Sequence, residues 1–279
     1  MAKAQLIYIV GDLHGDWDKF NSFLSILLTR FRQARRVRDL AREFARLEII
    51  VLQVGDFGYW PHKDKGRSFR RSIRSLWHQD GIRNAMPGIR DDRIKIYWCD
   101  GNHENHDALD ALERAAPADN PEERFIEIMP CVYFAPFGSV LRLHDGTTVL
   151  FCGGAESTDK EFRVPGDSWW PQEAIDEHDM ARLPPPGSLT VDWVISHTCP
   201  SYFRVSTIYG NPAKNFDPSK RFLNSVFDIY RPKRWWFGHY HDYQQGMYQG
   251  CAWTAMDRCG NPRGGKWVEE VGCIKNNSE

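Results

Sequence analysis

The sequence has almost no net charge, no long apolar run and no closely paired cysteines, and each absence excludes a class of protein. Its 36 Lys and Arg nearly balance 37 Asp and Glu, for a formal net charge of -1, which argues against wholesale wrapping of nucleic acid. No stretch approaches the ~20 apolar residues of a membrane span. The apolar run before Gly11 is too short for a signal peptide and predicts a strand instead. Seven scattered cysteines without a CxxC pair indicate reduced thiols in a cytoplasmic protein.

What is present is an alternation of short apolar runs with segments of helical periodicity. The helical segments lie at 17–47 (one long helix or two short ones), at 67–79 and near 105–115. The pattern has no repeat and no linker, so it predicts one domain over 1–279, of mixed α/β class, built around two packed sheets. The principal predicted strands are 4–10, 47–54, 94–99, 131–135, 139–144, 147–154, 192–196 and 233–241.

Side chains that bind metals follow five of these strands. One Asp-Gly turn or one histidine at a strand end is usually structural. Five successive strand ends with such side chains indicate a binding site instead, because ligands of α/β folds bind beyond the carboxyl ends of the strands. The sequence therefore predicts a metal site there. In chain order, the residues are Asp12 and His14, Asp56, Asn102 and His103, His197, and His239 with His241.

The donor types indicate which metals the site would take. Carboxylates, an amide oxygen and imidazoles without a thiolate suit Mn, Fe or Zn better than Mg or Ca. Two ions ~3.5–4 Å apart need a bridging carboxylate and separate ligands on each side. Residues i and i+2 of an extended chain point to one face, so His239 and His241 can bind different ions. We expect two divalent ions, Mn first and Fe or Zn as alternatives.

The order of these motifs resembles the calcineurin-like metallophosphoesterase superfamily. The blocks D-x-H, GD, GNH, H and G-H-x-H all occur in order within residues 8–241. The resemblance implies a four-layer α/β/β/α sandwich with two central mixed β-sheets. It also implies seven metal ligands: Asp12, His14 and His241 for the first ion, Asn102, His197 and His239 for the second, and Asp56 as the bridge.

Two segments set the sequence apart within that resemblance. Phosphoprotein phosphatases and diadenosine tetraphosphate hydrolases of the superfamily carry GDxxDRG, where the arginine holds phosphate. Here the second block reads "GDFGYW", which argues against protein-phosphatase activity. The stretch 153–173 resembles a segment of uncharacterised bacterial and phage-type members and indicates no substrate.

The expected activity is hydrolysis of phosphate esters. A hydroxide held between two cations is a nucleophile near neutral pH, and the resemblance makes His103 the acid that protonates the leaving oxygen. Asp100 is the expected partner that keeps His103 charged. Alternatively, His103 only orients a neighbouring ligand, and Asp100 only caps the next turn.

Three functions stay open at this point. A phosphomonoesterase is the first, and a phosphodiesterase or nuclease is the alternative. A non-catalytic scaffold stabilised by the metals is the third possibility, and it belongs to a different functional class. The expected partner is a phosphorylated small molecule or nucleotide, with nucleic acid as the other possibility, no membrane, and an oligomeric state that the sequence does not indicate.

Basic residues could replace the missing phosphate-binding arginine. Arg163 lies in "DKEFRVPG", and Lys63, Lys65 and Arg67 precede the basic helical segment. Arginine suits phosphate because its planar group can bind two oxygens at once. The alternative for the 62–83 stretch is an amphipathic helix with a solvated basic face.

Overall fold

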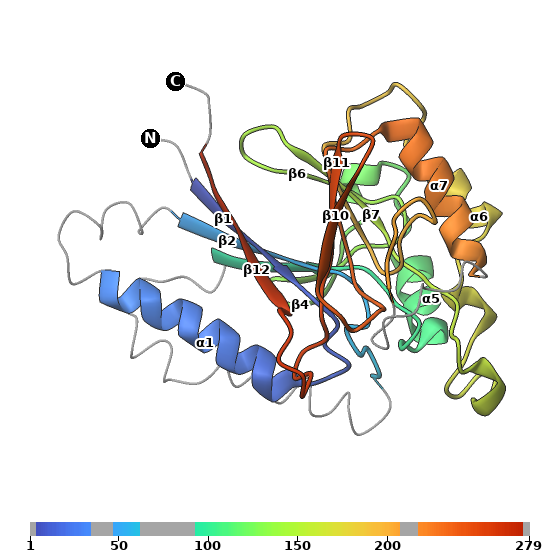
Figure 1. Ribbon diagram of the computed structural model, residues 1–279, viewed down its shortest axis with the longest axis horizontal. Coiled ribbons are helices and arrows are strands. Elements are labelled where there is room, and N and C mark those ends of the chain that lie inside the picture. Colours follow the sequence, from blue (N-terminus) through green and yellow to red (C-terminus); the bar gives the residue numbers. More distant parts are fainter. Residues whose placement is uncertain (1–3, 35–46, 62–92, 207–216, 276–279) are drawn as a thin grey trace.

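The computed structural model describes residues 4–34, 47–61, 93–206 and 217–275. Two six-stranded sheets pack face to face, with α1 outside one sheet and α6 and α7 outside the other (Figure 1). The predicted helix at 67–79 and the end of the one predicted at 17–47 lie outside the described residues. The helices include α1 (Trp17–Ala34), α5 (His106–Ala115), α6 (Glu177–Ala181) and α7 (Pro218–Tyr230), with 3-10 turns η2 (Pro121–Glu123), η3 (Lys160–Phe162) and η4 (Pro171–Glu173).

The first sheet has the order β12-β1-β2-β3-β5-β4. Its four inner strands are parallel, and the edge strands β12 and β4 are antiparallel to their neighbours. The carboxyl ends of the inner strands therefore meet at one edge of the sheet. The strands are β1 (Ala4–Val10), β2 (Leu47–Gln53), β3 (Ile94–Trp98), β4 (Ile126–Met129), β5 (Val132–Phe134) and β12 (Val268–Lys275).

The second sheet repeats this plan in the order β10-β11-β9-β8-β7-β6. Strands β11, β9, β8 and β7 are parallel, and the edge strands β10 and β6 are antiparallel. The strands are β6 (Val140–Arg142), β7 (Thr148–Cys152), β8 (Trp193–Ser196), β9 (Arg234–Phe237), β10 (Gln244–Tyr248) and β11 (Cys251–Ala255).

Three apolar clusters separate the four layers. Strand residues alternate between the two faces of a sheet, so Ile7 packs between the sheets while Tyr8 packs toward α1. The outer face of the second sheet packs against α7 through Leu223 and Phe227. Burial of this apolar surface on both faces of each sheet is the main stabilising contribution. The predicted α/β/β/α sandwich is confirmed.

Several elements were not predicted from the sequence: β4, β12, α6 and α7. Helix α7 has a clear signal, because Asp217 caps Ser219 N and Pro218 occupies the first helical position, as helix starts favour. The strand predicted at 233–241 ends at Phe237, since His239 has a φ of 69° and His241 a φ of 51°. None of the helices in the described ranges combines the length and apolarity needed to cross a bilayer.

Candidate metal centre

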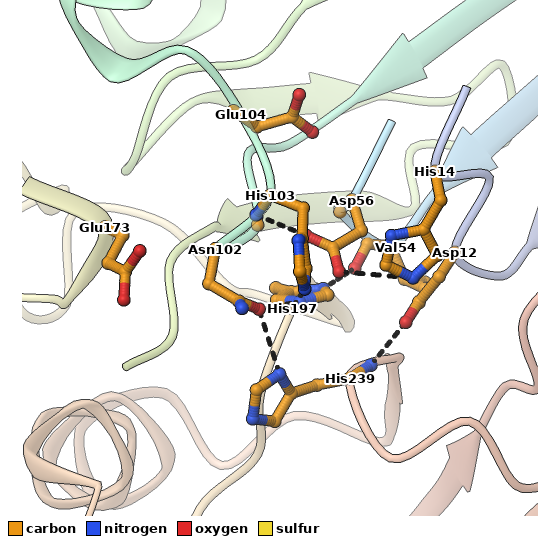
Figure 2. A network of polar contacts seen from close by, with 12 residues as sticks. Asp12, His14, Val54, Asp56, Asn102, His103, Glu104, Glu173, His197 and His239 are labelled. Atoms are coloured by element: carbon orange, nitrogen blue, oxygen red, sulfur yellow. Dashed lines mark hydrogen bonds and ion pairs between the residues drawn. The ribbon is translucent and has the colours of Figure 1, made fainter. Parts of the chain in front are cut away.

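The seven predicted metal ligands lie together where the strands of both sheets end, and Figure 2 labels all of them but His241. The first sheet supplies the residues that follow β1, β2 and β3, and the second supplies those that follow β8 and β9. The peptide N–H of His239 donates to Asp12 Oδ2 at 2.9 Å. This hydrogen bond directly links the residues of the second sheet to those of the first.

Four of these side chains form the first half of the site. One ligand atom from each of Asp12, His14, Asp56 and His241 lies within 4.8 Å of the others. The Nε2 atoms of His14 and His241 face each other at 2.9 Å. The buried Oδ1 of Asp12 has no hydrogen-bond partner within the described part of the chain. Unpaired buried carboxylate oxygens are costly, and a cation among these four donors would remove that cost.

The second half is formed around the amide of Asn102. Its Oδ1 lies 3.0 Å from His197 Nε2 and 3.1 Å from His239 Nδ1. Asp56 stands between the halves, with Oδ2 3.5 Å from His14 Nε2 and Oδ1 3.4 Å from His197 Nε2. A carboxylate in this position can bridge two cations, one on each side. The donor set therefore fits two ions of the kind that bind oxygen and imidazole.

His239 and His241 lie in different halves of the site, as predicted, but the reason differs from the predicted one. His239 faces Asn102, and His241 faces Asp12 at 3.3 Å. The prediction took them for alternate residues of an extended strand. Both instead have positive φ beyond the end of β9, so a turn separates them.

The backbone of the ligand loops is strained. Non-glycine residues rarely adopt positive φ, yet His14 and Asp56 have φ values of 47° and 52°, and His239 and His241 also lie in this region. Such conformations persist only where the surroundings fix them, and they cluster at functional sites. Here the Asp56 carbonyl accepts hydrogen bonds from Leu13 N at 3.0 Å and His14 N at 2.7 Å.

Two glycines let the ligand loops approach each other. A Cβ at Gly238 would lie 1.8 Å from Asp12 Oδ1, and one at Gly101 would lie 2.3 Å from Asp56 Oδ1. Side chains at these positions would displace the carboxylates. The glycines beside the metal-binding residues are therefore required by packing around the ligands.

The charges within the site favour an ionised Asp56 and a proton on His197. Burial raises the pKa of Asp56, but His197, His103 and His14 outweigh it and hold the pKa well below its usual value. Burial and His197 lower the pKa of His239 to about 3, which leaves a neutral imidazole ready to bind a cation. Burial lowers the pKa of His197, but the opposing effect of Asp56 is larger and raises the pKa to about 10. A cation bound there would have to displace that proton.

His103 lies at the site, but Asp100 is not its partner. The His103 peptide N–H donates to Asp56 Oδ1 at 2.8 Å, and its ring lies 4.9 Å from that of His14. Asp100 instead faces Gly153, where a Cβ would come within 2.1 Å of its Oδ1. Burial and Asp179 raise the pKa of Asp100 to about 7. Among the described residues, no hydrogen bond or ion pair joins Asp100 and His103.

Arg163 is the predicted substrate contact that the structure brings to the site. Its Nη2 lies 2.9 Å from His103 Nε2 and 3.1 Å from Nδ1, and its Nη1 donates to the Asn102 carbonyl at 3.3 Å. An ion pair with Asp159 at 2.8 Å holds the guanidinium, whose side chain is 10% exposed. The other predicted contacts, Lys63, Lys65 and Arg67, lie outside the described residues.

Three buried side chains near the site were missed by the sequence analysis. Glu104 accepts hydrogen bonds from Gly58 N at 3.0 Å and from Tyr59 N, which anchors the loop after Asp56. The position of Glu104 directly after His103 is a sequence feature from which its place near the site could have been predicted. The other two are Ser157, which contacts Asn102, and Glu173, which contacts Ser157. They lie far from the motifs in sequence, and no local pattern marks them.

The comparison with protein families identifies the chain. The model of the calcineurin-like phosphoesterases matches residues 6–243, so the chain belongs to this family, whose members depend on a binuclear metal centre. It is a phosphoric ester hydrolase. The family and the fold implied by the sequence resemblance are thus confirmed.

Solved structures similar to this chain are distant. Phosphopantetheinyl hydrolase (PptH) from Mycobacterium tuberculosis is 14% identical, with 97% of each chain covered and a TM-score of 0.44. GAP50, the anchor in the inner membrane complex of Plasmodium, is 9% identical, with 98% of this chain and 83% of that chain covered and a TM-score of 0.48. A putative 5'-nucleotidase from Staphylococcus aureus is 12% identical, with 97% and 54% covered and a TM-score of 0.41. The comparison with curated proteins found no match.

Proposed function

We propose that this chain is a manganese-dependent phosphomonoesterase that acts on a phosphorylated small molecule or nucleotide. The observation that carries the proposal is the position of Arg163, whose guanidinium is held at His103 beside the metal ligands. A terminal phosphoryl group has three non-bridging oxygens, so it can contact two cations and still offer two oxygens to an arginine. A diester offers fewer.

We assign the following roles in the reaction. The two cations, when bound, would supply an acidified water and positive charge opposite the phosphoryl oxygens. Arg163 would hold the phosphoryl group in line, since fixed donors around the developing charge need no reorganisation during the reaction. His103, between Arg163 and Asp56, would give a proton to the leaving oxygen. Fe or Zn is the alternative to Mn.

The test compares substrates and variants. The Mn-loaded protein would be assayed with an aryl monoester, an aryl diester, nucleotides, a phosphopeptide and single-stranded DNA. We expect the monoester or a nucleotide to have the highest kcat/KM. Arg163→Ala should lower kcat/KM for the monoester by roughly 10²-fold and for the diester by much less. Arg142→Ala, which removes an exposed arginine paired with Glu122, should change neither.

Two outcomes would contradict the proposal in different ways. A higher kcat/KM for the diester or for DNA, with a steep loss at high salt, would make the chain a phosphodiesterase or nuclease. Full metal occupancy without turnover of any substrate class would favour the scaffold.

A further inference from the structure

The segment 153–173, whose resemblance to other sequences indicates no substrate, contacts two consecutive residues of the site. Asn102 Nδ2 donates to Ser157 Oγ at 3.0 Å, and Arg163 reaches His103. One segment thus contacts a predicted metal ligand and the predicted acid next to it. The contact with Asn102 is the one that bears on metal binding.

An asparagine binds a cation through its oxygen only, so the orientation of its amide matters. Asn102 Oδ1 faces His197 Nε2 and His239 Nδ1, which is the cation side of the group. The Ser157 hydroxyl contacts the opposite, NH2 side of the same amide. It therefore holds the amide plane with the oxygen toward the two histidines, and it satisfies a buried donor, since Asn102 is 4% exposed.

Ser157 is itself held by a buried carboxylate. Its peptide N–H donates to Glu173 Oε1 at 2.6 Å, and Trp169 Nε1 donates to the same oxygen at 3.0 Å. Ser157 and Glu173 are 2% and 1% exposed. Figure 2 shows the Glu173 carboxylate on the side of Asn102 away from the other ligands. A buried carboxylate is costly unless it accepts hydrogen bonds, and both donors that it meets belong to this segment.

We propose that Ser157 is a positioning residue for Asn102, that Glu173 fixes Ser157, and that this chain of contacts sets the affinity of the second cation position. The inference rests on the proposed binuclear site. Partners that orient a metal ligand typically change affinity by about 10–100-fold when removed. The first position, with Asp12, His14 and His241, has no contact with Ser157 among the residues described and should keep its affinity.

The test is a Mn²⁺ titration of the full-length apo-protein by calorimetry, with electron paramagnetic resonance to detect the spin-coupled ion pair. Ser157→Ala should weaken the second binding event by about 10–100-fold, leave the first unchanged, and reduce the coupled signal at limiting metal. Ser157→Thr, which keeps the hydroxyl, should restore most of the affinity. Ser168→Ala removes a hydroxyl of the same segment that bonds to the Val164 backbone, and both affinities should match the parent.

Glu173 gives a second, independent pair of variants. Glu173→Gln keeps an oxygen that can accept from Ser157 N and should bind Mn²⁺ nearly as the parent does, whereas Glu173→Ala should resemble Ser157→Ala. Thermal unfolding of each apo-variant verifies that it is folded. If Ser157→Ala keeps both affinities within twofold of the parent, the inference is wrong. If the parent itself binds fewer than two Mn²⁺ ions, the binuclear site fails instead.

Discussion

The guanidinium of Arg163 lies against the imidazole of His103, with Nη2 2.9 Å from Nε2 and 3.1 Å from Nδ1. A hydrogen bond from the guanidinium requires a neutral imidazole, which has a single acceptor nitrogen, so at most one of the two contacts can be such a bond. The pKa of His103 agrees, because burial lowers it and Arg163 lowers it further, against a rise caused by Asp56. A phosphoryl group bound between the two would separate them and place an anion beside the ring.

The role of His103 as an acid can be measured through the leaving group. His103→Ala should keep its metal content but lose roughly 10²–10⁴-fold in kcat on alkyl phosphates, whose leaving oxygen needs a proton. Nitrophenyl phosphate has a good leaving group and should lose much less. Steady-state rates on both substrates check this, with His144→Ala as the surface control. Equal losses on the two substrates would point to a positioning role.

If Asp56 bridges two cations, its replacement should release both ions together. Its two carboxylate oxygens face His14 and His197, on opposite halves of the site. Asp56→Asn should therefore lower occupancy at both positions and reduce kcat at least 10²-fold. Metal analysis after dialysis against a Mn²⁺ buffer gives the occupancy, and Asp228→Asn, at an exposed aspartate of α7, should retain two ions. A variant that keeps one ion at full occupancy would exclude the bridge.

Glu173 should make folding stability fall as pH rises. Burial raises its pKa from 4.5 to about 7, against the opposing effect of its hydrogen bonds to Ser157 and Trp169. The folded state then holds a proton that the unfolded state has lost, so between about pH 4.5 and 7 the free energy of unfolding declines, by roughly 2 to 3 kcal/mol in total.

Glu173→Gln should remove that decline. The measurement is urea unfolding of the apo-proteins at intervals from pH 5 to 8, comparing slopes against pH rather than absolute stabilities. The exposed Glu161→Gln, in the same segment, should follow the parent. Parallel curves for the parent and Glu173→Gln would mean that the carboxyl titrates near its ordinary pKa.

Lys220 is a buried cation whose removal should stabilise the fold. Its residue is 2% exposed, its Nζ lies 5.6 Å from the centroid of the Tyr240 ring, and no carboxylate pairs with it among the described residues. It also lies in the first turn of α7, where the helix dipole disfavours a positive charge. Lys220→Met keeps the volume and should raise the free energy of unfolding by about 1 kcal/mol.

The same measurement on Lys233→Met provides the comparison. Lys233 is 77% exposed and paired with Asp192, so its loss should change stability little, because exposed ion pairs contribute little. If Lys220→Met is less stable than the parent, the contact with Tyr240 outweighs the cost of burying the ammonium.

The sheets and the grouping of the predicted ligands could be predicted because their signals are local. Each parallel strand appears as an apolar run, and each ligand directly follows one, so the positions of Asp12, Asp56 and Asn102 in the fold follow from the sequence alone. The parallel arrangement then brings the strand ends together. The edge strand β12 was missed because its sequence, VEEVGCIK, is half polar and its pairing with β1 joins opposite ends of the chain.

The contacts behind the ligands could not be predicted in the same way. Asp100 is close to His103 in sequence, yet its carboxyl lies beside Gly153. Ser157 and Glu173 reach Asn102 only through the path of the loop after β7, which depends on tertiary packing. Sequence proximity thus gave the wrong partner for His103, and distance in sequence hid the partner of Asn102.

The candidate metal centre takes its predicted ligands from both sheets, and this would give bound cations a mechanical role. Asp12 and Asp56 follow strands of one sheet, and His197 and His241 follow strands of the other, so an ion between them ties the two halves of the sandwich at one end. Each ion that binds only the folded chain stabilises it by about 2.7 kcal/mol at 100 times its Kd. A chain deprived of its cations would therefore lose catalytic activity and resistance to unfolding together, and its abundance in a cell would follow the supply of metal.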